Sequence, residues 1–264
     1  MTQADYTEYL DFAKDLAKQA GDIAREHFKV GVAADKKADN TPVTIADKAI
    51  NSLVIEKVKA AYPTHDVLGE EESDQTGASE FVWVCDPIDG TSPYSFGLPY
   101  SCFMLALVED GEPMVAVIYD IFSDRLYSAT KGGGTLMNGE PVHVNAESDI
   151  SLSVVSGTGR GNPVIDVPQL QKVITSITHR TLTLMCVGQE ALLVANGSIE
   201  GGVFVPTTAY DVAAPMLIVR EAGGKVTDLL GNDQRYDQPV NGLVYSNGLI
   251  HDDLLAAVQE SLVS

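Results

Sequence analysis

The sequence predicts a mixed α/β protein in which residues 1–264 form one unit, with an N-terminal half of about 1–150 and a C-terminal half of about 151–264. Three observations support this prediction. Helical patterns open the chain, strand patterns joined by glycine turns fill its middle, and strands alternate with helices in the second half. Because no repeat, low-complexity segment or linker separates the halves, we expect them to pack as layers of one unit.

The composition excludes several classes of protein. The chain carries 17 Lys and Arg against 37 Asp and Glu, a formal net charge of −20, so it lacks the basic surface that binds nucleic acid polymers or anionic membranes. Its apolar runs are shorter than the ~18 residues of a membrane-spanning helix, and Met1–Glu8 lacks the basic and apolar regions of a secretion signal. We interpret most of the excess acid as a solvated surface.

The cysteines point to a reducing compartment. Cys85, Cys102 and Cys186 are odd in number, far apart in sequence and set among apolar residues. This pattern is typical of buried reduced thiols rather than of a disulfide framework. We therefore expect a cytoplasmic protein with neither nucleic acid nor membrane as a partner.

Two helices are predicted at the start of the chain. Apolar residues recur at steps of three and four over Leu10–Phe28 and again over Ile50–Ala61, which is the spacing of a helix with one buried face. We expect the second helix to begin at about Thr44 and to end at Pro63. A short strand-like run, Asp66–Leu68, comes next.

The middle of the chain has the pattern of a β-meander. Ser101–Glu109 and Pro113–Tyr119 are strand-like runs, and Asp110-Gly111-Glu112 between them favours a hairpin. Arg125–Thr130 and Pro141–Asn145 continue the meander through glycine-containing turns.

Strands and helices alternate in the second half. The expected strands are Leu152–Ser156, Thr181–Val187, Gly202–Val205, Lys225–Asp228 and Leu243–Ser246. The expected helices are Val167–Thr178, Gln189–Ala195, Asp211–Ala222 and His251–Val263.

The most specific local signal, Asp86-Pro-Ile-Asp-Gly-Thr91, follows the apolar strand Phe81–Cys85. Pro87 fixes its own φ, and Gly90 permits backbone conformations that a Cβ would forbid. We therefore expect a turn that points the two aspartates of the motif into one cavity, where they could bind a cation.

A helix is expected directly after this motif. Ser92 as N-cap and Pro93 at the first helical position are typical of a helix start. The N-terminus of such a helix suits a phosphate group. The alternative is an acidic, capped turn that binds no ligand.

Three further acidic residues lie at the ends of predicted elements. Glu70 follows Asp66–Leu68, Asp211 begins a helix after an apolar strand, and Asp47 lies three residues after Thr44. Each also has a structural interpretation: a solvated loop, an N-cap and the acidic half of a capping box, respectively.

Taken together, these motifs resemble those of the inositol monophosphatase family. Gly69-Glu70-Glu71, Asp86–Thr91 and Tyr210–Ala214 occur in the family's order and at similar separations, and the resemblance extends over nearly the whole chain. It implies a layered αβαβα sandwich with the active site between its halves. It also implies a Mg²⁺-dependent, lithium-sensitive phosphatase that acts on a small phosphorylated substrate and forms a homodimer.

The resemblance further implies a set of metal ligands. Glu70, Asp86 and the carbonyl oxygen of Ile88 would bind a first Mg²⁺ ion. Asp86 would bridge to a second ion, which Asp89 and Asp211 would also bind. A third, weaker ion is expected near Glu70, so the family implies two to three ions.

Catalytic and phosphate-binding roles follow from the same resemblance. Asp47 and Thr91 would orient the attacking water, and Glu70 would act with them as a catalytic residue. The N–H groups of Gly90, Thr91 and Ser92 would bind the phosphate.

The chemistry of the motifs agrees with metal-assisted hydrolysis. They contain no Lys or Arg, so metal ions have to neutralise the phosphate, and hard oxygen ligands suit Mg²⁺. The sequence lacks an Asp-x-Asp-x-Thr start, a Ser/His/Asp or cysteine phosphatase loop and an H-E-x-x-H zinc motif. A non-catalytic metal- or phosphate-binding protein on the same scaffold is the alternative, but the intact set of motif residues favours an enzyme.

The sequence departs from the family pattern where the substrate would bind. Phe204 stands where inositol-specific members carry a glutamate, and Gln189 and Glu190 replace small residues after Gly188. The expected substrate-binding residues are Asp89, Gly188, Gln189, Glu190, Phe204 and Asp211. We expect a pocket that discriminates weakly between phosphomonoesters, because Phe204 offers no acceptor to a hydroxyl. The alternative is that Phe204 packs in the core and Glu190 supplies the acceptor.

Inositol 1-phosphate is the expected substrate. The alternative substrates are histidinol phosphate, a 3′(2′),5′-bisphosphate nucleotide and fructose 1,6-bisphosphate.

Overall fold

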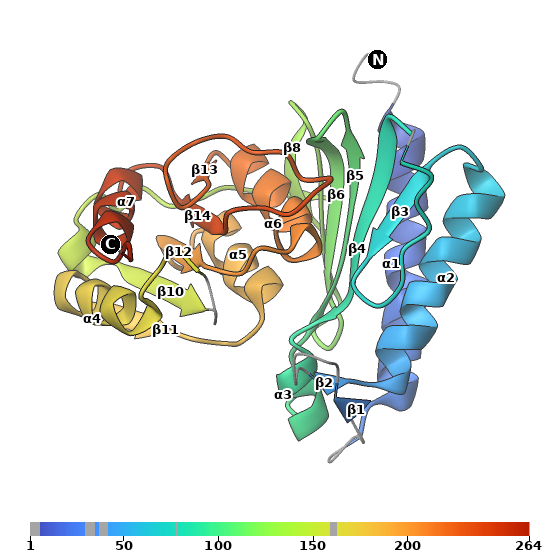
Figure 1. Cartoon of the computed structure of the whole chain (residues 1–264), viewed down its shortest axis with the longest axis horizontal. Coiled ribbons are helices and arrows are strands. Elements are labelled where there is room, and N and C mark those ends of the chain that lie inside the picture. Colours follow the sequence, from blue (N-terminus) through green and yellow to red (C-terminus); the bar gives the residue numbers. More distant parts are fainter. Residues whose placement is uncertain (1–5, 30–34, 37–41, 78, 159–162, 264) are drawn as a thin grey trace.

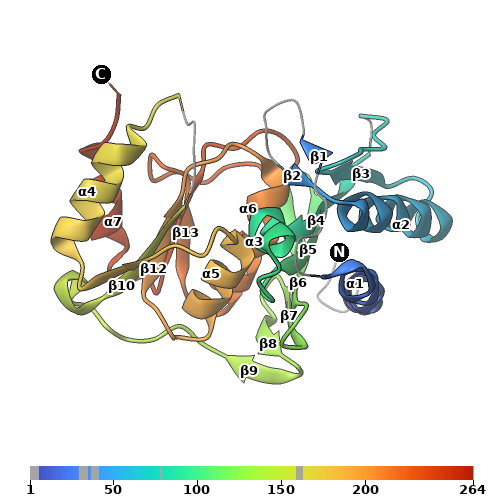
Figure 2. The ribbon, with the colours of Figure 1, turned by 90° about the horizontal axis from the view of Figure 1, so that it is seen from below.

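The computed structural model describes residues 6–29, 35–36, 42–77, 79–158 and 163–263. Helices and sheets stack in the order α, β, α, β, α, which confirms the expected sandwich (Figures 1 and 2). The outer helices are α1 (Thr7–His27) and α2 (Ile45–Ala61), the middle ones α5 (Val187–Ala195) and α6 (Ala209–Glu221), and those beyond the second sheet α4 (Val167–Ile177) and α7 (His251–Gln259). Of the N-terminal segment that we expect to lack a secretion signal, residues 1–5 lie outside the described residues.

The first sheet has seven strands in the order β3-β4-β5-β6-β7-β8-β9. They are β3 (Asp66–Gly69), β4 (Phe81–Asp89), β5 (Cys102–Glu109), β6 (Glu112–Asp120), β7 (Arg125–Thr130), β8 (Gly134–Met137) and β9 (Glu140–Val142). Only the β3–β4 pair is parallel in this sheet. Asp110 and Gly111 join β5 to β6 with φ values of 49° and 85°, the conformation that a tight hairpin requires.

The second sheet has five strands in the order β11-β10-β12-β14-β13. They are β10 (Val154–Thr158), β11 (Arg180–Leu182), β12 (Gly201–Phe204), β13 (Lys225–Thr227) and β14 (Leu243–Ser246). The remaining elements are small: β1 (Asp35–Lys36) pairs with β2 (Pro42–Val43), α3 (Thr91–Phe96) follows β4, and a 3₁₀ turn spans Ile150–Leu152.

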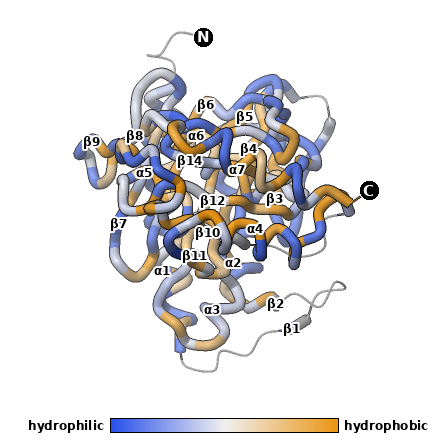
Figure 3. The backbone as a smooth tube through the Cα atoms, turned by 90° about the vertical axis from the view of Figure 1, so that its left-hand side faces the viewer, coloured by the Kyte–Doolittle hydropathy of each residue, from blue (hydrophilic) through white to orange (hydrophobic). Residues whose placement is uncertain are grey.

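Both faces of the first sheet are buried, which explains why its central strands are continuous apolar runs. Trp83 and Phe103 pack with α1 and α2 on one face. Val84 and Met104 pack on the other face, in a cluster that includes α5, α6 and residues of the second sheet such as Tyr245. In Figure 3 the hydrophobic stretches accordingly run through the strands, and hydrophilic segments lie around them.

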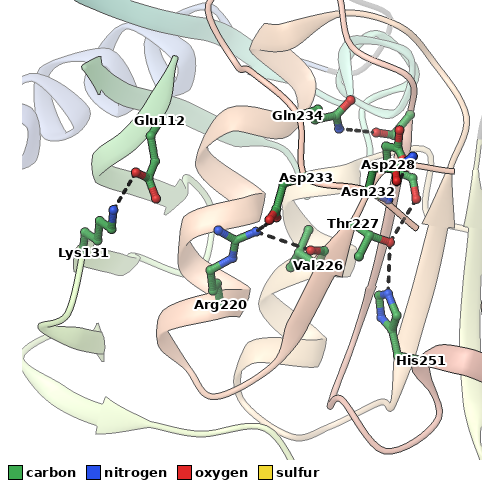
Figure 4. Close-up of polar contacts among 11 residues, drawn as sticks. Glu112, Lys131, Arg220, Val226, Thr227, Asp228, Asn232, Asp233, Gln234 and His251 are labelled. Carbon is green, nitrogen blue, oxygen red and sulfur yellow. Dashed lines mark hydrogen bonds and ion pairs between the residues drawn. The ribbon is translucent and has the colours of Figure 1, made fainter. Parts of the chain in front are cut away.

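Buried polar contacts fix the second sheet to its helices. Figure 4 shows the Thr227 hydroxyl between the carbonyl oxygen of Asp228, at 2.9 Å, and Nε2 of His251, at 3.0 Å. Burial lowers the pKa of His251 to about 4, so its ring is neutral at physiological pH. His251 therefore serves the structure of this half. Arg220 of α6 pairs with Asp233 at 3.0 Å in the same region.

Several sequence-based boundaries are wrong. The predicted strand Thr181–Val187 ends at Leu182, and its last residue opens α5. An apolar run of this length does not distinguish a strand from a buried helix. The predicted strand Leu152–Ser156 begins only at Val154, the last helix ends at Gln259 instead of Val263, and β8 was not expected as a strand.

None of the described helices is both long and apolar enough to cross a lipid bilayer.

The side chain of Glu221 joins the meander to α6. Its two carboxylate oxygens accept the N–H groups of Gly132, at 2.8 Å, and Gly134, at 2.9 Å, in the turn before β8. The hydroxyl of Thr135 donates to the carbonyl oxygen of Ile218 at 2.7 Å beside this contact. The turn is therefore held against the middle helical layer.

We expect Glu221→Ala to destabilise the protein by about 1–2 kcal/mol, because two N–H groups lose a charged acceptor. Its Tm should fall by roughly 2–8 °C in thermal unfolding. Glu140→Ala, which removes an exposed carboxylate from β9, serves as the control and should leave the Tm within about 1 °C. Equal Tm values for wild type and Glu221→Ala would contradict this account.

Candidate active site

The two aspartates of the Asp86–Thr91 motif lie on β4 itself, not on a turn after it as predicted. Asp86 is opposite Met104 of β5, whereas Asp89 is opposite Cys102, so β4 contains one extra residue between the two pairs. In a regular strand, residues three apart point to opposite faces. The extra residue of this β-bulge shifts that alternation and brings both carboxylates to one side.

Four carboxylates meet at this end of the sheet. Glu70 follows β3, which is parallel to β4, and its N–H donates to the carbonyl oxygen of Cys85 at 3.1 Å. Asp211 lies in the first turn of α6. Burial raises the pKa of Asp86 well above its usual range, and the charges of Glu70, Asp89 and Asp211 raise it further. We call Glu70, Asp86, Asp89 and Asp211 the carboxylate cluster.

The donor set of the cluster fits Mg²⁺. Asp86 is 2% exposed, and its Oδ1 atom has no hydrogen-bond partner among the described residues. A buried carboxylate oxygen without a partner is unfavourable unless a cation binds it. The cluster supplies only hard oxygen ligands, which are those that Mg²⁺ prefers.

Asp47 and Thr91 are direct neighbours beside the cluster. Thr91 Oγ1 lies 3.2 Å from Asp47 Oδ1 and 3.0 Å from the carbonyl oxygen of Ile88. Asp47 Oδ2 accepts the Thr44 N–H at 2.8 Å, within the capping box that begins α2. Burial is the main reason why the pKa of Asp47 rises to about 6. The predicted capping box and the expected pairing with Thr91 therefore coexist in one side chain.

The helix expected after the motif is present, but its predicted cap is wrong. The N-cap of α3 is Gly90, with φ = 83°, and Thr91 is the first helical residue. Ser92 and Pro93 thus lie inside the first turn. Because first-turn N–H groups have no intrahelical acceptor, those of Thr91 and Ser92 are available to a ligand.

Asp89 is bound by the N-terminus of α5. Its carboxylate accepts the N–H groups of Val187, at 3.1 Å, and Gly188, at 2.6 Å, and Cys186 Sγ lies 3.0 Å from Oδ2. A Cβ on Gly188 would lie only 2.8 Å from Asp89 Oδ2 and 2.9 Å from Met104 Sδ. The absent side chain of Gly188 therefore leaves room for this carboxylate.

The residues expected to bind substrate are mostly buried. Phe204 is 6% exposed and packs in the core shared by the two sheets. Glu190 is fully buried, and its Oε1 accepts the Leu184 N–H at 2.8 Å. Gln189 is 6% exposed. Contact of these side chains with a substrate stays a prediction.

Sequence reasoning missed three neighbours of the cluster. Cys186 binds Asp89, Thr208 binds the Asp211 carboxylate through its hydroxyl, and the half-buried Tyr210 lies close enough for Asp211, Glu70 and Asp86 to raise the pKa of its phenol. Thr208 and Asp211 have the spacing of a capping pair, which could have identified Thr208. No sequence signal links Cys186 to Asp89.

Two surface cavities lie away from the cluster. One of about 380 Å³ adjoins Lys14 and Lys18 of α1, and one of about 370 Å³ adjoins Arg220 and Lys225. Neither contains a member of the carboxylate cluster among its lining residues.

A model of the inositol monophosphatase family matches residues 5–263 of the chain. The chain belongs to this family. It is 30% identical to inositol monophosphatase 3 of Solanum lycopersicum, with 96% of this chain and 97% of the relative covered. It is 33% identical to the histidinol-phosphatase of Chlorobaculum parvum, with the same coverage.

A solved inositol monophosphatase structure has the same fold. The enzyme of Thermotoga maritima superposes with a TM-score of 0.87 at 27% identity, covering 96% of this chain and 98% of that one. The protein is thus a phosphatase of the inositol monophosphatase family, whose members are metal-dependent, generally with Mg²⁺, and sensitive to lithium.

We expect Asp86→Asn to stabilise the metal-free protein at neutral pH. A carboxyl group whose pKa is raised by folding binds protons more tightly in the folded state, so its contribution to stability falls as pH rises above its usual value near 4. The amide of the Asp86→Asn variant does not ionise, so the variant avoids this loss of stability. The Tm in EDTA should exceed that of the wild type by several degrees at about pH 7.5, at roughly 2–4 °C per kcal/mol.

The gain should shrink as the pH is lowered toward the ordinary pKa near 4, because the wild-type carboxyl is protonated in the folded state there and becomes protonated in the unfolded state as well. Asp110→Asn changes the net charge equally at an exposed site and should not raise the Tm in EDTA. A lower Tm for Asp86→Asn than for the wild type in EDTA would contradict the electrostatic account.

Proposed function

We propose that this protein is a Mg²⁺-dependent phosphomonoesterase that hydrolyses a small phosphorylated alcohol, with inositol 1-phosphate as its main substrate. The observation that carries the proposal is the environment of Asp86. It is a buried carboxylate with an unpartnered oxygen, surrounded by the carboxylates of Glu70, Asp89 and Asp211. A bound cation would supply the partner that this oxygen lacks.

The metal ligands are assigned as the family resemblance implies. In the proposal, Glu70, Asp86 and the carbonyl oxygen of Ile88 bind one Mg²⁺. Asp86, Asp89 and Asp211 bind a second, and a weaker third site lies at Glu70. Bound there, Mg²⁺ supplies an activated water and offsets the charge on the phosphate.

Thr91 and Asp47 orient the attacking water and accept its proton. The Thr91 hydroxyl donates toward Asp47 Oδ1, so its oxygen lone pairs face outward to accept a hydrogen bond. As the water attacks phosphorus, its proton passes to Thr91 while the Thr91 proton passes to Asp47. The bond between phosphorus and the ester oxygen breaks, and the departing alkoxide takes a proton from solvent and leaves as the alcohol. Because its pKa is about 6, Asp47 is ionised at neutral pH and able to accept that proton.

The start of α3 binds the phosphate. The N–H groups of Gly90, Thr91 and Ser92 lie at one helix N-terminus, where backbone donors and the helix dipole favour an anion. This places the phosphorus next to Thr91 and to the carboxylate cluster.

The alcohol side of the pocket is the less specific part. We assign Asp89, Gly188, Gln189, Glu190, Phe204 and Asp211 to it, and all of these except the half-buried Asp211 are buried. Histidinol phosphate is the second candidate substrate, because the histidinol-phosphatase relative is 33% identical over nearly the full length of both chains.

We further propose a cytoplasmic homodimer. The cytoplasm is supported by the three buried cysteines, which form no disulfide among the described residues. The homodimer is the state implied by family membership. The single-unit organisation of residues 1–264 is supported by the core shared between the two sheets.

Phosphate release from a panel of esters tests the function. We expect turnover of inositol 1-phosphate with Mg²⁺ and none in EDTA, and Asp89→Asn should lower kcat/KM by at least ~10²-fold while unfolding cooperatively. Asp110→Asn is the charge-matched control. Full activity in EDTA or in Asp89→Asn would overturn the proposed metal site.

The same panel tests the substrate. We expect inositol 1-phosphate to give the highest kcat/KM, with histidinol phosphate, fructose 1,6-bisphosphate or a nucleoside 3′,5′-bisphosphate within about 1–3 kcal/mol of it. A preference for inositol 1-phosphate above ~10⁴-fold over every other ester would refute the weakly discriminating pocket. A higher value for histidinol phosphate would replace the main substrate by the second candidate.

Thr91→Ala should lower kcat by ~10²–10⁴-fold, because the attacking water loses the hydroxyl that orients it and accepts its proton. The stabilisation of the protein by added Mg²⁺ should be unchanged in a thermal-shift titration. Thr91→Ser keeps the hydroxyl and should retain most of the activity. Loss of Mg²⁺ stabilisation together with an unchanged kcat would show a structural role instead.

A further inference from the structure

A group of two thiols and a carboxylate lies beside the carboxylate cluster. Cys102 is the first residue of β5, Asp89 is its partner across the ladder on β4, and Cys186 is the N-cap of α5. One ligand atom from each of the three lies within 4.8 Å of the others. All three residues are at most 6% exposed. Three separate segments of the chain thus converge on one point.

We propose that Cys102, Cys186 and Asp89 form a binding site for a thiophilic divalent cation such as Zn²⁺ or Cd²⁺. Its occupation withdraws Asp89 from the carboxylate cluster and thereby antagonises Mg²⁺.

The donor set selects a different metal from the neighbouring cluster. Thiolate sulfur prefers Zn²⁺ and other soft cations, whereas Mg²⁺ takes oxygen ligands. Bond lengths of 2.0–2.3 Å place the ligand atoms of a tetrahedral zinc ion roughly 3.3–3.8 Å apart. Asp89 Oδ2 and Cys186 Sγ are already 3.0 Å apart, and the 4.8 Å limit for the set requires adjustments of about 1 Å or less. Three protein ligands with a fourth position for a small ligand is a common composition of open zinc sites.

The backbone of Gly90 forms one wall of this site. Cys186 lies against half-buried Gly90, where a Cβ would be 3.1 Å from Cys186 Cβ and 3.2 Å from its Sγ. Gly90 therefore places no side chain over the thiol. Each thiol loses one proton when it binds the ion, so loading releases two protons to solvent.

Binding at this site competes with Mg²⁺ for one carboxylate. Asp89 Oδ2 lies 3.0 Å from Cys186 Sγ, and Asp89 also belongs to the carboxylate cluster. The antagonism rests on the proposed function, since it requires Asp89 to bind Mg²⁺. The binding of the soft cation is independent of the proposed function.

Titration of Cd²⁺ into the reduced, metal-free protein tests binding directly. We expect the ultraviolet charge-transfer band of cadmium thiolate to saturate at one equivalent. Cys102→Ala should lower the affinity by at least about tenfold and the band by about half. Cys85→Ala is the matched control, because Cys85 is equally buried but packs on the opposite face of the sheet. No band at one equivalent, or equal loss in Cys85→Ala, would overturn the proposal.

Zinc X-ray absorption on the wild type gives a measurement that needs no variant. Two sulfur neighbours at about 2.3 Å are expected, and a shell of oxygen and nitrogen alone would overturn the site.

Inhibition of the Mg²⁺-dependent activity by Zn²⁺ tests the antagonism separately from the metal site and from the proposed function. Zn²⁺ should inhibit the Mg²⁺-dependent activity of the wild type at least about tenfold more strongly than that of Cys102→Ala. Equal inhibition would refute the antagonism. An inactive protein that still shows the cadmium band would leave the metal site standing and overturn the proposed function.

Discussion

The structure depends on holding four carboxylates together where they repel one another. Asp86 is buried at the end of β4, and Glu70, Asp89 and Asp211 approach it from β3, from the same strand beyond the bulge and from α6. The repulsion among these carboxylates favours separation of the three elements β3, β4 and α6, since like charges of low solvation repel strongly. The apolar layers on both faces of the first sheet prevent this separation. The packing of these layers therefore offsets the repulsion within a site that is favourable only when cations are bound.

The starts of four helices partly offset this repulsion. Four helices begin beside the carboxylate cluster: α2, α3, α5 and α6. At three of these starts an acidic side chain is bound. The Thr44 N–H donates to Asp47, the N–H groups of Val187 and Gly188 donate to Asp89, and the Thr208 hydroxyl donates to Asp211. Each helix N-terminus carries a partial positive charge. In a region whose motifs contain no Lys or Arg, backbone dipoles thus provide the permanent positive potential. They keep the acids in place without competing with metal ions as a fixed cation would.

Sequence reasoning succeeded where a pattern has a local cause. The capping box of Thr44 and Asp47, the hairpin at Asp110-Gly111 and the helices with one buried face follow from contacts within a few residues. It failed where the cause is distant. That Asp86 and Asp89 lie on a bulged strand depends on the register with β5, and the start of α5 at Val187 depends on Asp89, which accepts its first N–H groups. The contact of Cys186 was not predicted for the same reason, because its partner Asp89 lies 97 residues earlier in the chain.

The position of α6 has a consequence for synthesis of the chain. Val212 to Val219 of this helix are buried almost completely between the two sheets. The first sheet is complete once residue 142 has emerged from the ribosome, yet the helix that covers its inner face is made only at residues 209–221. Until then the sheet exposes an apolar surface of the kind that promotes aggregation. The nascent N-terminal half therefore has an aggregation-prone face until α6 is synthesised and packs against it.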